Sequence, residues 1–142
     1  MKKKELIPGE PCGLLRRLAI IFYDFAIVIS LLILATMLAM LAGFRGSTAL
    51  KDPGYTMYLF TTWFLYVTWC WNKGGMTVGM RAWRVRIEDE KGLKPGWGKS
   101  AVRFFASLLS AAAAGLGFIW SLVDSRQRTW HDILSKTRMI RF

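Results

Sequence analysis

Three residues of this chain carry charge at positions where charge is costly or paired: Arg17, Asp24 and Asp132. Asp24 is the single ionisable residue in an apolar run from residue 18 to residue 42, about 10 Å along a helix axis from Arg17. A carboxylate at that depth costs about 2.5 to 3.5 kcal/mol, so we expect it to face protein or a wet cavity. A buried carboxyl with few partners also retains a proton more readily. Asp24 is therefore a candidate proton or cation carrier.

The partners of these residues can be predicted in part. Arg17 and Asp24 are seven residues apart and share a helix face, but they are too distant for direct contact, and we expect Arg17 to extend outward to lipid phosphates. Thr68, in a second apolar run, would lie at about the same depth as Asp24 and is therefore a candidate partner for its carboxylate. Asp132 could pair with Arg128, four residues earlier, or with Arg17. Two roles stay open for Asp24: ion or solute handling, or a structural contact that locks the helices.

Composition separates charge from hydrophobicity along the chain. Of 142 residues, 54% are apolar, the net charge is +11, and 20 Lys and Arg stand against nine Asp and Glu. Nearly all charges fall outside three long apolar runs, which is typical of a membrane protein and argues against a soluble enzyme. Two Cys and one His, His131, do not make a disulfide scaffold or a metal centre, and no phosphate-binding or nucleophile motif is present. We expect no enzyme activity, no cofactor and no metal.

The apolar runs predict the helices. Residues 18–42 predict a first membrane span of about 37 Å, and residues 55–72, with Tyr at one end and Trp at the other, predict a second. The connector between them is short and rich in Gly and Pro, so the two spans form an antiparallel hairpin. Residues 104–123, rich in Ala and Gly, also have spanning length but could break at Gly115 or Gly117. This third run either spans or re-enters.

Two segments alternate apolar and polar residues, residues 82–88 and residues 137–142. We predict a small basic β element over about residues 82–97 on the membrane surface. Trp83, Val85 and Ile87 would face the bilayer or protein, and Arg84, Arg86 and Glu88 would face water. If the C-terminal segment pairs with it, both lie on one side of the membrane and the third run is re-entrant or hides a further crossing. The alternative is that both segments are irregular basic loops.

The basic residues also indicate topology and partners. The positive-inside rule places the N-terminus and the connector after residue 72 in the cytoplasm, with residues 43–54 outside. Positive charge beside the cytoplasmic leaflet indicates anionic lipids as partners and no nucleic acid. The fold class predicted is an all-α membrane protein with a small cytoplasmic β element, forming one domain over residues 1–142 that ends in a basic segment, residues 124–142. His131 is expected to be an ordinary interfacial histidine.

Three motifs resemble those of the RDD family of small bacterial membrane proteins: RLAIIFYD in the first span, GMTVGMRAWRVRI after the second, and RTWHDILSKT near the C-terminus. The family is named for one Arg and two Asp, which map here onto Arg17, Asp24 and Asp132. The resemblance runs from Cys12 to the end and departs from the family at Met80, where a Lys is frequent. It implies a multi-pass inner-membrane protein, for which transport of unidentified ligands and, in some relatives, sodium/proton exchange have been suggested.

Three functions are compatible with the sequence. The first is an oligomeric transporter of protons, sodium or a small solute, with Asp24 as carrier and Arg17 and Asp132 as a cytoplasmic gate pair. Self-association is expected because two or three helices enclose a path poorly. The second is a scaffold or accessory subunit without transport, in which the Arg and both Asp are structural. The third, a holin-like pore former, fits the size but not the strand-like segments.

Overall fold

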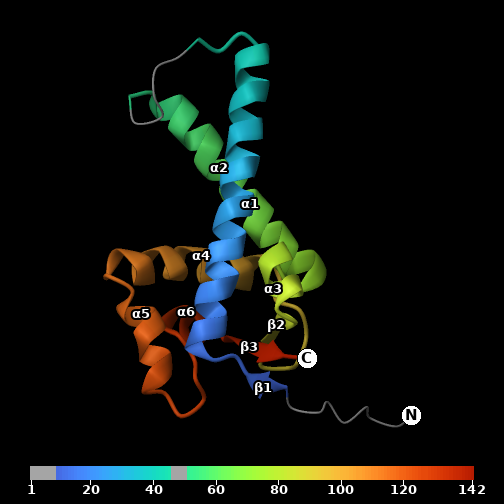
Figure 1. The fold of residues 1–142 in the computed structure, drawn as a ribbon, viewed down its shortest axis with the longest axis vertical. Helices are drawn as coiled ribbons and strands as arrows, with labels where there is room; N and C mark the ends of the chain where they lie inside the picture. The colour runs from blue at the N-terminus through green and yellow to red at the C-terminus, as the bar shows by residue number, and fades with distance from the viewer. Residues whose placement is uncertain (1–8, 46–50) are drawn as a thin grey trace, which may run out of the picture.

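The computed structural model describes residues 9–45 and 51–142, and Figure 1 shows two long helices rising from a small mixed body. The N-terminal basic segment and part of the connector predicted outside lie beyond these described residues. The long helices are α1 (Leu14–Leu41) and α2 (Pro53–Gly74). The helical elements of the body are α3 (Val78–Ala82), α4 (Trp97–Ala112), α5 (Leu116–Ile119), the 3-10 turn η1 (Trp120–Leu122) and α6 (Trp130–Leu134).

Helix α1 is long because its sequence contains neither Pro nor Gly. Its 28 residues extend about 42 Å, and Gly43 follows its end with a φ of +94°. Most of its large apolar side chains are exposed, among them Phe22, Phe25 and Leu34, so this surface requires lipid or protein around it. Of the described residues, α1 forms the one helix that is long and apolar enough to cross a membrane by itself.

Helix α2 begins and ends at clear sequence signals. The Asp52 side chain caps its start by accepting a hydrogen bond from the Tyr55 N–H at 3.2 Å, and the left-handed Gly75, with a φ of +68°, follows its end. The Tyr58 hydroxyl donates to the Ala35 carbonyl at 3.1 Å where α2 crosses α1. Helix α2 is long enough but not apolar enough to qualify as a membrane span, so of the two predicted spans only the first coincides with a helix that could cross a membrane.

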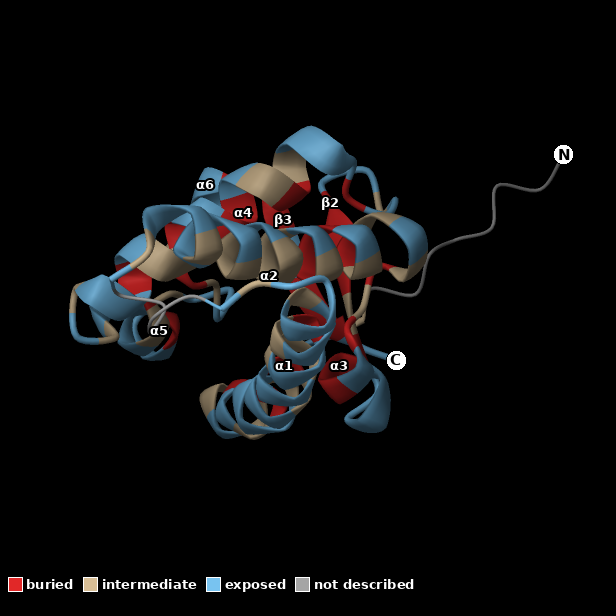
Figure 2. Ribbon diagram, turned by 90° about the horizontal axis from the view of Figure 1, so that it is seen from above, coloured by how far each residue is buried: buried red, intermediate tan, exposed pale blue. Residues whose placement is uncertain are grey.

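Helix α4 lies across the foot of the two long helices (Figure 1) and has an inside-out pattern. Its buried positions include Ser100, Arg103 and Ser110, whereas Phe105 and Leu109 are exposed. In water the opposite arrangement would be favourable, because an amphipathic helix normally buries its apolar face. Figure 2 shows the buried residues gathered between α4, the sheet and the foot of α1.

The third apolar run is broken, not straight. Ala114 and Gly115 adopt φ values of +55° and +77° after α4, and the segment of α5 and η1 is bent by 106° from α4. The predicted break at Gly115 is therefore confirmed. Gly117 fits tightly after the turn, since a Cβ there would overlap the Ser110 Oγ. This geometry corresponds to a broken span or a re-entrant loop.

The predicted strands form and pair. Strands β1 (Glu10–Pro11), β2 (Val85–Asp89) and β3 (Thr137–Arg141) make an antiparallel sheet in the order β1-β3-β2. Val85 and Ile87 are almost completely buried, as predicted, and Ile87 lies opposite Met139. Strand β1 is only two residues long, too short to produce an alternation that would predict it.

The outward face of β2 differs from the prediction. Glu88, predicted to face water, is only 5% exposed. Its carboxylate lies 2.5 Å from the Arg86 guanidinium and 3.6 Å from that of Arg138, on the neighbouring strand. The prediction was wrong because these arginines pair with Glu88 and cover it.

Candidate functional site

The centre of the body is a buried cluster of charge around Asp132. One carboxylate oxygen lies 2.9 Å from Arg17 Nη1, and the other accepts a hydrogen bond from Arg103 Nη1. Arg103 Nη1 also donates to the Thr137 hydroxyl at 2.9 Å. The three charged side chains are at most 3% exposed. Buried charges persist when they are paired and hydrogen-bonded, and here a single carboxylate serves two guanidinium groups.

A local sequence signal sets the position of Asp132. Thr129 and Asp132 form a capping box at the start of α6, in which the Asp132 carboxylate accepts a hydrogen bond from the Thr129 N–H at 3.1 Å. The same carboxylate that begins this short helix therefore also binds the two arginines. Asp132 connects α6, α1 and α4.

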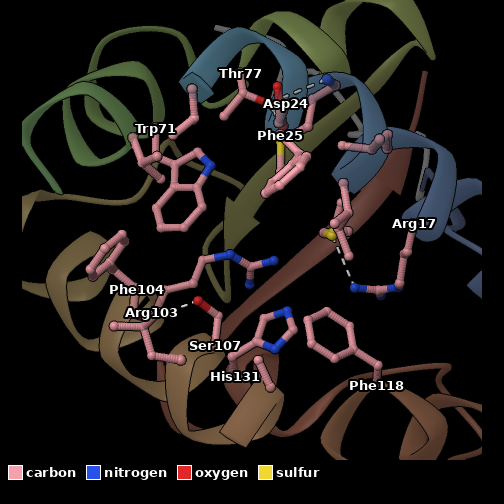
Figure 3. Close-up of a pocket in the computed structure, with 18 of the residues that line it drawn as sticks. Arg17, Asp24, Phe25, Trp71, Thr77, Arg103, Phe104, Ser107, Phe118 and His131 are labelled. Atoms are coloured by element: carbon pink, nitrogen blue, oxygen red, sulfur yellow. Dashed lines mark hydrogen bonds between the residues drawn. The ribbon is translucent and has the colours of Figure 1, made fainter. Parts of the chain in front are cut away.

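Arg17 is turned into the protein. Its Nε donates to the Cys12 carbonyl at 3.0 Å, its Nη2 donates to the Gln127 carbonyl at 2.9 Å, and its Nη1 lies 2.9 Å from the Met139 sulfur (Figure 3). The expectation that Arg17 reaches lipid phosphates was wrong, because two carbonyl groups and Asp132 hold it inside. Its predicted pairing with Asp132 is confirmed.

The neighbouring residues Arg128 and His131 also differ from expectation. Arg128 pairs with Asp124 at 3.1 Å and not with Asp132. His131 is buried, and its Nε2 lies 2.9 Å from the Thr129 hydroxyl. Burial, with help from the charge of Arg103, lowers the His131 pKa to about 3. The ring is thus an uncharged part of the core and not an interfacial group.

The charges of the arginines also determine the state of Asp132. Burial alone would raise the Asp132 pKa, but the nearby guanidinium groups of Arg103 and Arg17 outweigh it and hold the pKa well below the usual range. Asp132 is therefore a charged carboxylate near neutral pH.

Asp24 lies in a different environment. Its Oδ1 accepts a hydrogen bond from the Gly79 N–H at 2.8 Å, and its Oδ2 accepts one from the Thr77 hydroxyl. Thr77 is the N-cap of α3, so Asp24 binds the start of that helix. A Cβ at Gly79 would lie 2.7 Å from Asp24 Oδ1 and 2.9 Å from the Ile20 carbonyl, which explains the glycine. Among the described residues, no cation forms an ion pair with Asp24.

The structure corrects one predicted site residue and adds one that was not predicted. Thr68 does not reach Asp24, because its hydroxyl donates to the Phe64 carbonyl of its own helix at 2.6 Å. Arg103, a residue at the edge of the third apolar run, belongs to the site. A signal was present: Arg103 is three residues from Ser100 and seven from Ser110, which is the spacing of one helix face.

A cavity of about 260 Å³ lies between α1, α2 and α4 (Figure 3). Its apolar wall includes Ile20, Phe25, Val28, Trp63, Val67 and Phe104. Its polar wall includes Arg17, Asp24, Thr77, Arg103 and His131. The cavity therefore joins the two carboxylate environments, since Asp24 lines it directly and both arginines bound to Asp132 line it too.

Three polar atoms of the cavity wall have no hydrogen-bond partner among the described residues: Trp71 Nε1, Arg103 Nε and His131 Nδ1. Buried polar atoms are normally hydrogen-bonded, and an unpaired one costs about 1 to 3 kcal/mol. The Arg103 guanidinium also lies 5.4 Å from the Trp71 ring. Each atom is shielded from a water-sized probe, so a bound molecule would reach it only after a small shift of the side chains around it.

The fold is that of a small, mostly helical protein in which one helix that could cross a membrane joins a body built around a buried Arg–Asp–Arg cluster. The chain belongs to the RDD family, whose sequence model matches residues 11–136. The match includes Arg17, Asp24 and Asp132, and the family is one of membrane proteins of unknown function. No curated protein and no solved structure matches the chain.

Proposed function

We propose that this chain is a multi-pass inner-membrane protein that binds a small solute in the cavity and transports it, as a homo-oligomer, in exchange or symport with protons. The observation that supports the proposal most directly is the position of Asp24. This carboxylate has no ion-pair partner among the described residues. It lies on the wall of a cavity of about 260 Å³, and Arg17 and Arg103 line another part of the same cavity.

The exposed surfaces support placement in a membrane. The apolar outer face of α1 and the exposed apolar face of α4, with Phe105 and Leu109, would contact lipid. We propose that α2 provides the second crossing and that the N-terminus and the body lie in the cytoplasm. Exposed basic residues of the body, Arg84, Lys94 and Arg138, would then contact anionic lipids of the cytoplasmic leaflet.

Asp24 is better suited to carry a proton than to hold sodium. Both of its carboxylate oxygens already accept hydrogen bonds, from Thr77 and Gly79. A sodium ion would need further oxygen ligands besides the lone pairs that Asp24 keeps free, whereas a proton needs only one carboxylate oxygen, for example the one bound by Thr77. Protonation of Asp24 would weaken its hold on α3, a helix that forms part of the cavity wall through Met80. This provides a physical link between proton binding and the shape of the site.

The role of a gate is not proposed for Arg17 and Asp132. Their pair is shared with Arg103 and fully buried, and separating such a pair leaves uncompensated buried charge at a cost of about 3 to 5 kcal/mol. We propose that this cluster stays rigid while the part of the cavity wall that contains Asp24 moves.

The transport proposal can be tested in proteoliposomes that contain a pH-sensitive dye. Outward gradients of organic acids, amino acids, sodium and potassium are imposed one at a time. We expect at least one gradient to change internal pH faster than in protein-free vesicles, and Asp24→Asn to abolish this excess. Glu90→Gln, a substitution at an exposed turn position, is the matched control and should retain it. If no gradient moves protons above the protein-free rate, the proposal fails.

A second function, a scaffold or accessory subunit without transport, is favoured by one specific observation. Arg17, Asp24 and Asp132 all make structural contacts: two join α6 to α1, and the third binds the start of α3. Under this alternative Asp24→Asn lowers the melting temperature, and neither the native protein nor any variant shows flux. The size of the protein in mild detergent is informative for both functions, since the transporter requires a homo-oligomer.

A further inference from the structure

We infer that the cavity binds a small organic acid, with an apolar ring or short branched chain and one carboxylate, an inference that depends on the proposed solute-binding function. The carboxylate would accept hydrogen bonds from Trp71 Nε1 and Arg103 Nε, and the apolar part would fill the space towards Phe25 and Val28. The observation behind it is the set of unpartnered donors in an otherwise apolar cavity.

The unpartnered donors are deeply buried. Trp71 is 7% exposed and Arg103 is 1% exposed, so bulk water cannot satisfy them freely. The N–H groups of Trp and of Arg Nε are donors only, which means that they require an acceptor and cannot pair with each other. They come from α2 and α4, and Figure 3 shows both side chains extending into the same space. A ligand that satisfies both must carry an acceptor group.

The charges around this position favour an anionic acceptor. Arg17 and Arg103 share the single carboxylate of Asp132, and His131 is neutral, so one positive charge at this end of the cavity is uncompensated. Asp24 also lines the cavity, but its oxygens are occupied by Thr77 and Gly79. An anion would therefore place its charge beside Arg103 and its apolar part towards Asp24.

The size and the wall of the cavity limit the ligand. A cavity of roughly 150 Å³ is enough to hold benzene, and this cavity measures about 260 Å³. Phe25 and Phe104 contribute aromatic walls, and Val28 and Val67 contribute aliphatic ones. A single aromatic ring with a carboxylate fits this volume.

The inference is tested by calorimetric titration of the full chain in nanodiscs of zwitterionic lipid, with three probes of similar size: benzoate, benzyl alcohol and benzylamine. We expect benzoate to bind at least about tenfold more tightly than the other two, because a charged acceptor makes the stronger hydrogen bonds. Trp71→Phe, which removes the N–H and keeps an aromatic ring beside Arg103, should weaken benzoate about tenfold and benzyl alcohol much less, because the neutral hydroxyl makes the weaker hydrogen bond. Trp69→Phe, at a half-exposed position of the same helix, is the matched control and should change neither.

Ala111→Trp, at the cavity wall, provides a second test that does not depend on Trp71. It should abolish binding of every probe. If benzoate and benzyl alcohol bind equally and Ala111→Trp blocks both, the carboxylate inference is overturned while solute binding in the cavity stands. If no probe binds, solute binding itself is contradicted. If phosphatidylglycerol added to the nanodiscs removes benzoate binding, the site takes a lipid headgroup and the inference is also overturned.

Discussion

Asp24 and Asp132 differ in their burial, in the charge of their hydrogen-bond donors and in their contact with the cavity. Asp132 is fully buried, is paired with two guanidinium groups and caps α6. Asp24 binds neutral donors only, the Thr77 hydroxyl and the Gly79 N–H, and lines a cavity. Two buried cations disfavour protonation of the carboxylate that they bind, whereas a carboxylate bound only by neutral donors takes up a proton more readily. The comparison supports a structural role for Asp132 and agrees with the proposed role of Asp24 as the proton carrier.

The largest expected effect is at Asp132. Asp132→Asn keeps the side-chain shape but leaves Arg17 and Arg103 buried without a counter-charge, and we expect a loss of about 3 to 5 kcal/mol of unfolding free energy. Chemical denaturation in detergent measures it. Asp124→Asn, which removes a surface pair with Arg128, is the control and should cost at most about 1 kcal/mol. Equal effects of the two substitutions would contradict the assignment of structure to Asp132.

An intermediate effect is expected at Gly79. Gly79→Ala places a Cβ 2.7 Å from Asp24 Oδ1 and 2.9 Å from the Ile20 carbonyl, so α3 must move away from α1. We expect a loss of about 1 to 3 kcal/mol, measured by thermal melting. The matched control is Gly98→Ala within α4, where a Cβ meets nothing within 4 Å and alanine favours the helix. A neutral Gly79→Ala would mean that the contact between Asp24 and α3 is not tight.

The Asp132 cluster also predicts a pH dependence of stability through His131. The folded His131 pKa is about 3 and an unfolded histidine titrates near 6.5, so the unfolded chain binds the additional proton between these values. Stability is complete above pH 6.5 and falls as pH decreases, by about 2 kcal/mol at pH 5. Because this is the single histidine of the chain, His131→Gln should flatten the profile between pH 6.5 and 5. A variant with the same slope as the native protein would contradict the buried, neutral state of His131.

Much of the fold was predictable because its signals are local. The alternation in residues 82–88 and 137–142 predicted strands β2 and β3 and left their pairing open, and the break after α4 lies at Gly115, one of the two glycines predicted for it. The pairing of Arg17 with Asp132 was one of two alternatives, and the structure selects it. In each case a single pattern of spacing or backbone chemistry was sufficient.

The rest depends on contacts between distant segments, which spacing does not determine. The partners of Asp24 are the N-cap and the first turn of α3, not Thr68 inside α2, because the lower end of α1 lies against α3. Arg103 was not predicted because it lies at the edge of an apolar run, where a charge normally marks the end of a helix. Its spacing from Ser100 and Ser110 is a signal in the sequence, but that signal becomes informative only once α4 is known to bury these polar side chains.

The smallest expected effect on stability is at Asp24, although substitution of this residue should abolish transport. Asp24→Asn keeps an acceptor for the Gly79 N–H, so we expect it to change the unfolding free energy by about 1 kcal/mol or less. The measurement is the rate of proton-coupled flux in proteoliposomes reconstituted with equal amounts of folded protein. We predict that Asp24→Asn melts close to the native protein and has no flux above protein-free vesicles. Native flux in this variant would contradict the functional role of Asp24.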